Sequence, residues 1–272
     1  MSRSRRTLVV FFTLALVLIS QQAGAQAVSM PKWQGGVAFD SGVRSALRAP
    51  TGPERTMADD TSSVLLYALV AAPFVAGAAR TVAAHGSWRD TVGLSLVSAE
   101  AFGIAFAATY AAKTVALRER PYATGDGLAV YCTTHATDPS CGSDRNASFF
   151  SGHSAIAFTG AGLLCTQQIF LGPKGVDALG CAGGMLAATA TSMLRIVADM
   201  HYASDTLIGA TIGLTAGMLV PYILHFAPWA PFPIAKHMRN VDEKKSSPLV
   251  GFSVSPFGTQ GGGGLAISAQ FQ

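Results

Sequence analysis

Residues 154–173 read SAIAFTGAGLLCTQQIFLGP, a continuous stretch without a charged side chain. Its length matches the roughly 20 apolar residues with which an α-helix crosses the hydrocarbon core of a bilayer. Four further segments have a similar length and apolar character: Thr61–Ala79, Thr91–Ala112, Ala178–Leu194 and Thr206–Leu224, of which only Thr91–Ala112 contains a charged residue, Glu100. Their many small residues suit close packing of helices in lipid. The sequence therefore predicts an all-α fold, a transmembrane bundle of five to six helices, with the buried helices of a soluble bundle as the alternative.

The composition favours the membrane as a partner. Half of the 272 residues are hydrophobic and 12% are charged, whereas about a quarter are charged in a typical soluble domain. The net charge of +4 is modest, and the basic residues are scattered without interleaved aromatic residues. We therefore expect no nucleic-acid partner.

The N-terminus predicts export. Three arginines precede the apolar run Leu8–Ile19, and small residues follow at 23–25, which is the layout of a secretory signal. An uncleaved first transmembrane helix is the alternative, because residues 7–26 carry no charge over a bilayer length. Either way, the chain is expected to be exported to or through a bacterial inner membrane.

The connections between the apolar segments predict a topology. If the helices alternate in direction, the polar segments Lys113–Phe150 and Arg195–Asp205 lie on one face of the membrane, outside the cytoplasm. Basic residues after Leu224 then lie inside, as the positive-inside rule requires: Lys236, Arg239, Lys244 and Lys245. We therefore expect an inner-membrane protein whose polar connections face the periplasm, with a periplasmic protein as the alternative.

The chain divides into four parts. They are a signal peptide or signal anchor (1–25), an exported segment that is irregular with some short helix (26–60), the helix bundle (61–227), and a basic linker and tail (228–272). In the tail, apolar and small residues alternate over Val250–Val254 and again over Leu265–Ala269, on either side of Gly261–Gly264. This pattern predicts a β-hairpin-like tail, with a flexible or edge-pairing tail as the plainer interpretation.

The four cysteines fall into two pairs. Cys132 and Cys141 lie nine residues apart in a polar loop, which indicates a candidate loop-closing disulfide in an oxidising compartment. Cys165 and Cys181 lie within apolar runs and are expected to be buried free thiols. No Cys and His residues have zinc-site spacing, so we predict no metal site.

Three clusters of polar and ionisable residues flank the apolar segments. The first contains Lys113, directly after an apolar segment, and Arg120 before Pro121. A lysine at a helix end usually snorkels or compensates the helix dipole, and neighbouring Arg118 and Arg120 are ordinarily surface charges. This cluster alone therefore predicts little.

The second cluster, Ser151-Gly152-His153, directly precedes the apolar segment Ser154–Pro173. Ser151 is a suitable helix N-cap. The N–H groups at such a helix start form a ready anion site, and Gly152 allows close approach of a ligand to the backbone. His153 is an awkward core residue on a first helical turn, which favours a functional role.

The third cluster places Arg195, His201 and Asp205 between two apolar segments. Asp205 follows His201 by one helical turn, so it is expected to accept from one ring nitrogen and leave the other with a free lone pair. This is the arrangement of a nucleophilic histidine and its orienting base. Asp199 is expected to point elsewhere, to an arginine.

Together the clusters resemble the type 2 phosphatidic acid phosphatase superfamily, which is related to class A acid phosphatases and vanadium haloperoxidases. Its pattern is Lys-x6-Arg-Pro, Pro-Ser-Gly-His and Ser-Arg-x5-His-x3-Asp. The similarity covers roughly residues 61–225. Within the superfamily, the chain resembles the membrane lipid phosphatase branch. Phe150 replaces the family's proline and Leu194 its serine, and neither position supplies indispensable chemistry in the family's mechanism.

The resemblance implies a role for each residue. His201 would attack phosphorus and form a phosphohistidine, Asp205 would orient it, and His153 would protonate the leaving oxygen. The phosphate-binding residues would be Lys113, Arg120, Ser151, Gly152 and Arg195. Because fixed cations can stabilise the charge on a transferring phosphoryl group, no metal or cofactor is expected. The expected enzyme is a phosphatase whose substrate is a lipid phosphate or pyrophosphate. The alternatives are a soluble periplasmic non-specific acid phosphatase and a vanadate-dependent haloperoxidase.

Some charged residues lie outside these clusters. Glu100 is the one acid within an apolar segment; although such acids are functional by default, we expect it to form a hydrogen bond across the bundle. Asp138, Asp144 and Arg145 in the long loop are expected to be solvated charges.

Overall fold

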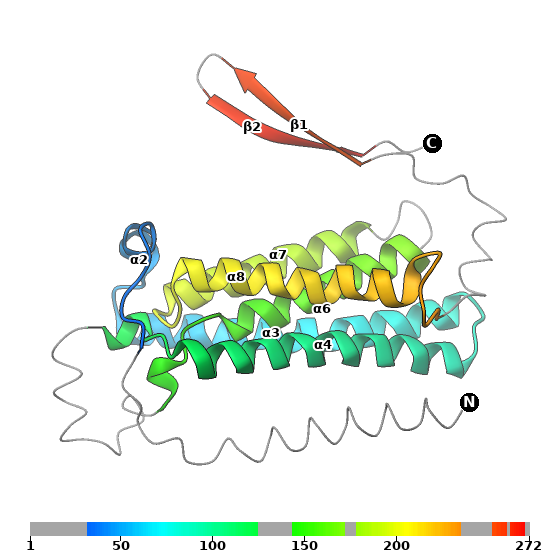
Figure 1. Ribbon diagram of the computed structural model, residues 1–272, viewed down its shortest axis with the longest axis horizontal. Helices are drawn as coiled ribbons and strands as arrows, with labels where there is room; N and C mark the ends of the chain where they lie inside the picture. Colours follow the sequence, from blue (N-terminus) through cyan, green and yellow to red (C-terminus); the bar gives the residue numbers. More distant parts are fainter. Residues whose placement is uncertain (1–31, 125–142, 172–177, 235–251, 260–261, 270–272) are drawn as a thin grey trace.

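The computed structural model describes residues 32–124, 143–171, 178–234, 252–259 and 262–269. Five long helices lie side by side and form a bundle (Figure 1). They are α3 (Gly52–Ala83), α4 (Trp88–Ala116), α6 (Gly152–Leu171), α7 (Ala178–Val197) and α8 (Ala203–Leu214), which continues into the π-helical turns η5 (Thr215–Leu219) and η6 (Tyr222–Phe226). The predicted all-α bundle is confirmed. A short helix, α2 (Asp40–Leu47), and two 3-10 turns, η2 (Pro121–Ala123) and η4 (Ser143–Asn146), lie between or before them.

Helix α6 is the centre of the bundle. It contacts α3, α4, α7 and α8, and 67% of its apolar stretch is buried, against 22–33% in the other four. Its buried residues are mostly small, such as Ala157 and Ala161, so the neighbouring backbones approach it closely.

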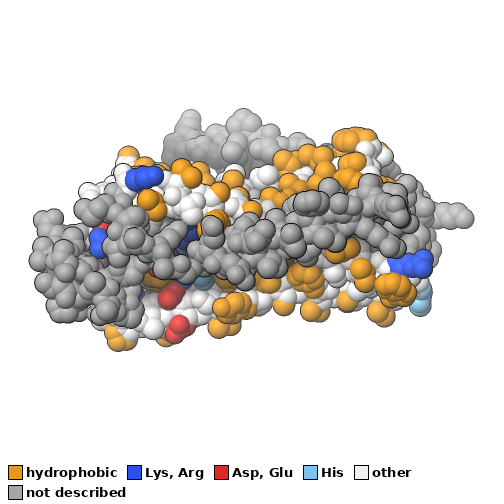
Figure 2. All heavy atoms as spheres, turned by 60° about the horizontal axis from the view of Figure 1, so that its bottom comes forward, with side chains coloured by type: hydrophobic (Ala, Val, Ile, Leu, Met, Phe, Trp, Pro, Cys, Tyr) orange, Lys and Arg blue, Asp and Glu red, His pale blue; other side chains and the backbone are white. Residues whose placement is uncertain are grey.

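The outer surface of the bundle suits lipid. All five helices are long and apolar enough to cross a membrane. Large apolar side chains point outward from them, among them Tyr67, Val75, Leu186 and Leu207. On the face shown in Figure 2, hydrophobic side chains extend along the bundle, whereas most charged side chains lie toward its ends. This distribution is the one that a bilayer requires.

Helix α3 begins nine residues before the apolar segment that predicted it. Thr51 caps the helix in a capping box with Glu54: each side chain accepts a hydrogen bond from the other residue's backbone N–H. The extra turns are polar, and they bring Asp59 to the end of the bundle where the polar clusters lie.

Glycines bring α8 against α6. Gly209, Gly213 and Gly217 recur every four residues, so they share one face of the helix. A Cβ atom on Gly213 would clash with the carbonyl oxygen of Ala155 on α6. This close approach fixes the start of α8 relative to the start of α6.

We expect Gly213→Ala to lower the melting temperature in detergent by roughly 3–10 °C, because overpacking costs about 1–3 kcal/mol. Gly183→Ala on α7 is the control, since a Cβ there meets nothing within 4 Å. It is expected to melt at or above the wild-type temperature. Equal melting temperatures for the two variants would show that the α6–α8 packing tolerates a methyl group.

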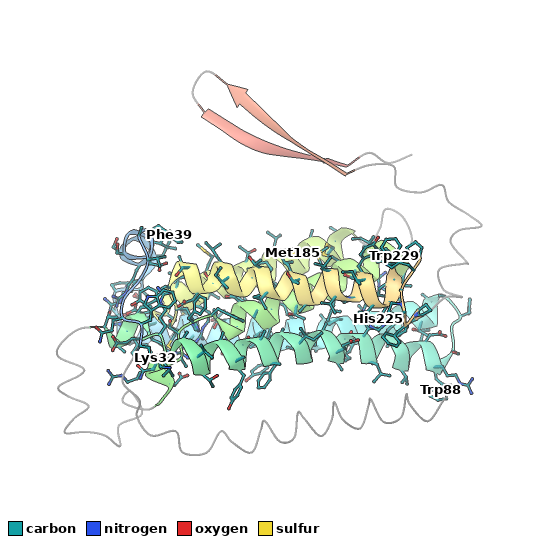
Figure 3. All side chains as sticks on the ribbon, in the orientation of Figure 1. Lys32, Phe39, Trp88, Met185, His225 and Trp229 are labelled. Atoms are coloured by element: carbon teal, nitrogen blue, oxygen red, sulfur yellow. A yellow bond between two sulfur atoms is a disulfide. The ribbon has the colours of Figure 1, made fainter. Side chains whose placement is uncertain are left out.

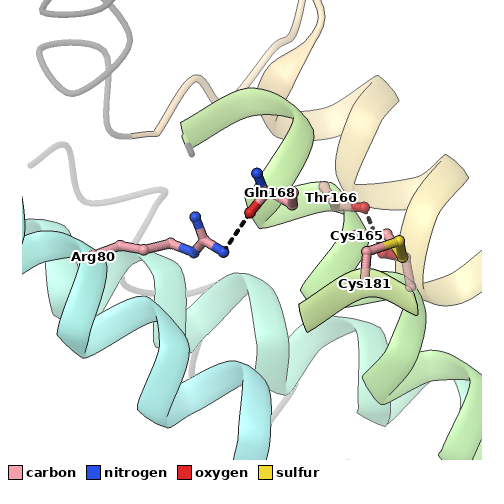
Figure 4. Close-up of a disulfide and its surroundings, with 6 residues drawn as sticks. Arg80, Cys165, Thr166, Gln168 and Cys181 are labelled. Carbon is pink, nitrogen blue, oxygen red and sulfur yellow. Dashed lines mark hydrogen bonds between the residues drawn. A yellow bond between two sulfur atoms is a disulfide. The ribbon is translucent and has the colours of Figure 1, made fainter. Parts of the chain in front are cut away.

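Cys165 and Cys181 form a disulfide between α6 and α7, with their Cα atoms 4.5 Å apart (Figure 4). The prediction of two free thiols was therefore wrong. The two cysteines are 16 apart in sequence, but the antiparallel helices bring them together, which apolar surroundings alone do not reveal. Cys132 and Cys141 lie outside the described residues.

Two smaller predictions are also confirmed. Strands β1 (Phe252–Thr259) and β2 (Gly262–Ala269) pair antiparallel, with Val254 opposite Ile267. Within the bundle, the carboxylate of Glu100 lies 2.7 Å from Nε2 of His225, a hydrogen bond between α4 and η6.

Candidate active site

The three polar clusters meet at one end of the bundle. The end of α4 carries Lys113, the start of α6 Ser151 to His153, and the end of α7 Arg195. Figure 3 shows Lys32 and Phe39 at this end, and Trp88, His225 and Trp229 toward the other. Because antiparallel helices alternate their ends, residues far apart in sequence share this site.

Backbone hydrogen bonds join the loops that carry the clusters. One bond connects the loop of Arg120 to the segment before α6. A second connects the loop of Arg120 to the loop of His201, and a third connects the start of α8 to the start of α6. These bonds are Ser148 N–H to Arg118 O at 3.0 Å, Tyr122 N–H to Asp199 O at 3.1 Å, and Ser151 N–H to Asp205 O at 3.1 Å. The loops therefore form one connected unit.

His201 is buried, with 2% of its surface exposed. Its Nδ1 lies 2.8 Å from the carbonyl oxygen of Ser148. A carbonyl can only accept, so Nδ1 carries the proton and Nε2 keeps its lone pair. Nε2 faces Nη1 of Arg120 at 3.5 Å. The ring therefore has the tautomer and orientation of a nucleophile aimed at an anion site.

Burial lowers the pKa of His201 well below its ordinary value, and the positive charges of Arg120 and Lys113 lower it further. The ring is consequently neutral at physiological pH. A neutral imidazole can attack phosphorus, whereas imidazolium cannot.

Asp205 contacts His201 less directly than predicted. Its Oδ2 lies 3.8 Å from His201 Nδ1 and instead accepts from the hydroxyl of Ser148 at 2.6 Å and from the N–H of Tyr202 at 3.1 Å. Oδ1 accepts from Arg118 at 2.5 Å. Ser148 thus links the two residues, since its hydroxyl holds Asp205 and its carbonyl holds His201.

Three cations lie near His201, and their positive charges lower its pKa. Lys113 Nζ donates to the carbonyl oxygen of Ala147 at 2.6 Å. Arg120 donates to both the backbone and the carboxylate of Asp144, each at 2.8 Å. Arg195 pairs with Asp59. Arg120 and Arg195 are almost fully buried, so their charges are little screened by solvent.

The start of α6 completes the site. The predicted N-cap is confirmed: the hydroxyl of Ser151 accepts from the N–H of Ser154 at 3.3 Å. First-turn N–H groups lack acceptors within their own helix, which leaves those of Gly152 and His153 able to bind an oxyanion. A Cβ atom on Gly152 would lie 3.2 Å from Thr109 and 3.9 Å from the Cε atom of Lys113, so the glycine lies close to one of the three cations. His153 Nε2 lies 3.2 Å from the hydroxyl of Ser63.

Helix α3 adds site residues that the sequence did not indicate. Ser62 accepts from Arg195 at 3.2 Å, Ser63 contacts His153, and Asp59 pairs with Arg195. They lie at positions 59, 62 and 63 of one helix, so they share a face. This spacing could have shown that the three residues lie on one face of a helix. It could not have shown that this face points toward the polar clusters.

Two expectations about surface charges were wrong. Arg118 is fully buried and pairs with Asp40 and Asp205. Arg145 is also buried and pairs with Glu119 at 3.1 Å, whereas Asp144 is 63% exposed but bonds Arg120. The reason is tertiary, because the segment before α6 folds back onto Arg118 and Arg120. Asp199 pairs with Arg44 and Arg48, as expected; Asp138 lies outside the described residues.

Asp59 pairs with the guanidinium of Arg195, the group that a phosphate would bind, and the side chain of Asp59 is 36% exposed. We expect Asp59→Asn to lower the inhibition constant of inorganic phosphate about two- to tenfold, because it removes a competing anion near Arg195. The measurement is competitive inhibition by phosphate, with Asp60→Asn, an exposed neighbour, as the control. A weaker phosphate affinity in Asp59→Asn would instead mean that Asp59 holds Arg195 in its binding position.

The fold and the site define a class of protein: a helical bundle of membrane-spanning length with a buried cationic site around a neutral histidine. Comparison with protein-family models matches residues 92–229 to the PAP2 superfamily. The match covers half of the chain and includes all three clusters. The chain therefore belongs to the PAP2 superfamily, which makes it a phosphatase-type enzyme, a phosphoric ester hydrolase. No curated protein and no solved structure matches the chain.

Proposed function

We propose that this protein is a membrane phosphatase that hydrolyses phosphomonoester or pyrophosphate bonds of lipid phosphates through a phosphohistidine, without a metal ion. The observation that carries the proposal is the setting of His201. Its Nδ1 is held by a carbonyl oxygen, and its free Nε2 faces Arg120 within a cluster of three cations.

In the proposed first step, Nε2 of His201 attacks phosphorus in line, and the bond from phosphorus to the leaving oxygen breaks. His153 in its protonated form donates a proton to that oxygen, and the phosphoryl group remains on His201. Lys113, Arg120 and Arg195 stabilise the equatorial oxygens, which is the main demand of phosphoryl transfer. In the second step, a water molecule attacks phosphorus and gives a proton to His153. The bond between phosphorus and Nε2 of His201 breaks, which releases phosphate and restores His201.

The position of the site supports a lipid substrate. It lies where five apolar helices end or begin, which corresponds to the depth of lipid headgroups when the helices span a bilayer. With the export signal and the basic residues beyond the last helix, this favours a bacterial inner membrane with the site facing the periplasm.

The test is phosphate release by the purified protein from phosphatidate, phosphatidylglycerophosphate, a polyprenyl pyrophosphate and a soluble aryl phosphate. We expect a lipid to have the highest kcat/KM, and a chelator to change the rate less than about twofold. Preference for the aryl phosphate, together with release of the protein from membranes by carbonate, would instead identify a soluble periplasmic acid phosphatase. No release from any of them would reject the proposal.

A further inference from the structure

The segment Lys32–Ala49, here called the N-terminal strap, contacts the loops of the active site. It contains α2, which lies beside the end of the bundle where α8 begins (Figure 1). Backbone hydrogen bonds attach it at three places: Lys32 N–H to Leu117 O, Glu119 N–H to Trp33 O, and Ala49 N–H to Val197 O. The strap lies outside the residues that match the PAP2 superfamily.

The strap encloses Arg118. The guanidinium lies between two aromatic rings, 4.0 Å from that of Trp33 and 4.2 Å from that of Tyr202. It also donates to the carbonyl oxygen of Gly35 and pairs with Asp40 at 3.0 Å. Burying an arginine without compensating charge is very costly, and Asp40 supplies one of its two counter-charges.

Asp40 is itself fully buried and ionised. Burial alone would raise the pKa of Asp40, but hydrogen bonds from Ser204, Val37 and Arg118 outweigh it and lower that pKa. Ser204 donates both its backbone N–H, at 2.8 Å, and its hydroxyl, at 2.7 Å. Ser204 precedes Asp205, so the strap is bonded directly to the start of α8.

A continuous chain of contacts then leads to the nucleophile. Asp40 pairs with Arg118, and Arg118 pairs with Asp205 at 2.5 Å. Asp205 accepts from the hydroxyl of Ser148, whose carbonyl oxygen holds Nδ1 of His201. Each link is a hydrogen bond between groups that are almost completely buried, so a displacement of Arg118 is expected to reach the imidazole.

The strap also holds the His201 loop from its other side. Arg44 on α2 binds Asp199 with two hydrogen bonds, at 2.6 and 2.8 Å, and Arg48 pairs with the same carboxylate at 2.9 Å. Asp199 has a left-handed backbone conformation, with φ of 62°, which is unfavourable for most residues. The two arginines therefore stabilise a sharp turn two residues before His201.

We infer that Asp40 and Arg118 are positioning residues for His201. Through them, the N-terminal strap helps to hold His201 in the orientation that the reaction requires. Neither residue belongs to the phosphate-binding cations. Their loss should therefore slow the chemical step and leave phosphate binding intact. The inference rests on the proposed role of His201 as nucleophile.

The test is Asp40→Asn in the full-length protein, assayed with phosphatidate in mixed micelles. We expect kcat to fall about 10- to 100-fold, because small misplacement of a reacting group has effects of that order. KM and the inhibition constant of inorganic phosphate are expected to change less than about threefold. A purely structural role would lower the amount of folded protein and would not separate kcat from phosphate binding.

Ser204→Ala is the milder second variant, because it removes the hydroxyl that bridges Asp40 and Arg118. We expect a threefold to tenfold lower kcat, with phosphate inhibition unchanged. Ser45→Ala is the matched control, since that exposed hydroxyl donates to Gly42 within α2. If Asp40→Asn does not fold, Ser204→Ala decides the question.

The inference is overturned if kcat stays within twofold of wild type, or if kcat and phosphate affinity fall together. His201→Ala separates this result from a failure of the proposed function. An inactive His201→Ala beside a normal Asp40→Asn rejects the positioning role alone. An active His201→Ala rejects the nucleophile, and the positioning role with it.

Discussion

His201→Ala is expected to lower the rate of phosphate release by at least several orders of magnitude. The variant lacks Nε2, the only atom that the proposed mechanism uses to attack phosphorus. Each tenfold loss corresponds to about 1.4 kcal/mol in the activation barrier. In a serine hydrolase, loss of the catalytic nucleophile costs about a millionfold in kcat.

The measurement is single-turnover phosphate release, combined with an alkaline quench that preserves phosphohistidine. Wild type is expected to accumulate a phosphorylated enzyme that acid destroys, and His201→Ala none. His85→Asn is the control: His85 is exposed in the turn between α3 and α4 at a positive φ of 50°, which asparagine tolerates. Near-normal turnover by His201→Ala would overturn the nucleophile assignment.

Arg195→Met is expected to lower kcat/KM by about 10²- to 10⁴-fold. The guanidinium is 3% exposed, and a fixed donor to the transferring oxygens is worth roughly that much in a site with little water. Its partner Asp59 is 36% exposed, so water can solvate this carboxylate once the arginine is gone. The fold should therefore survive, and the loss should report on catalysis.

Arg195→Lys distinguishes charge from geometry. Lysine keeps the positive charge but lacks the planar fork, so we expect it to recover only part of the loss. Arg55→Met is the control, because Arg55 donates to the carbonyl oxygen of Thr51, the N-cap of its own helix α3. An Arg195→Met variant with kcat/KM within threefold of wild type would remove Arg195 from the phosphate-binding set.

The main helices and the shared location of the clusters could be predicted from the sequence. A run such as residues 154–173 has few alternatives to a helix of membrane length. The spacing of His201 and Asp205 placed both near the start of α8, and Ser151 caps α6 as expected. These predictions succeeded because they depend on local periodicity and on residues close in the chain.

Predictions about which side chains contact one another succeeded less often. Arg118 and Arg120 are two residues apart and chemically identical, yet one bonds Asp40 and Asp205 while the other faces His201. Cys165 was expected to be a free thiol but is bonded to Cys181. Such outcomes depend on which segments meet, and the sequence pattern of one segment does not contain that information.

By itself, the sequence determined that the chain forms apolar helices of membrane length, with a phosphatase-type set of His, Lys and Arg residues at their ends. Only the tertiary structure decided how those residues work together: that Ser148 links Asp205 to His201, that Asp59 and Ser63 of α3 enter the site, and that the N-terminal strap encloses Arg118. The physical reason is the distance along the sequence over which each interaction acts. Helix formation follows from hydrophobic spacing along a few turns, whereas a buried charge must find its counter-charge wherever the fold brings one within about 3 Å.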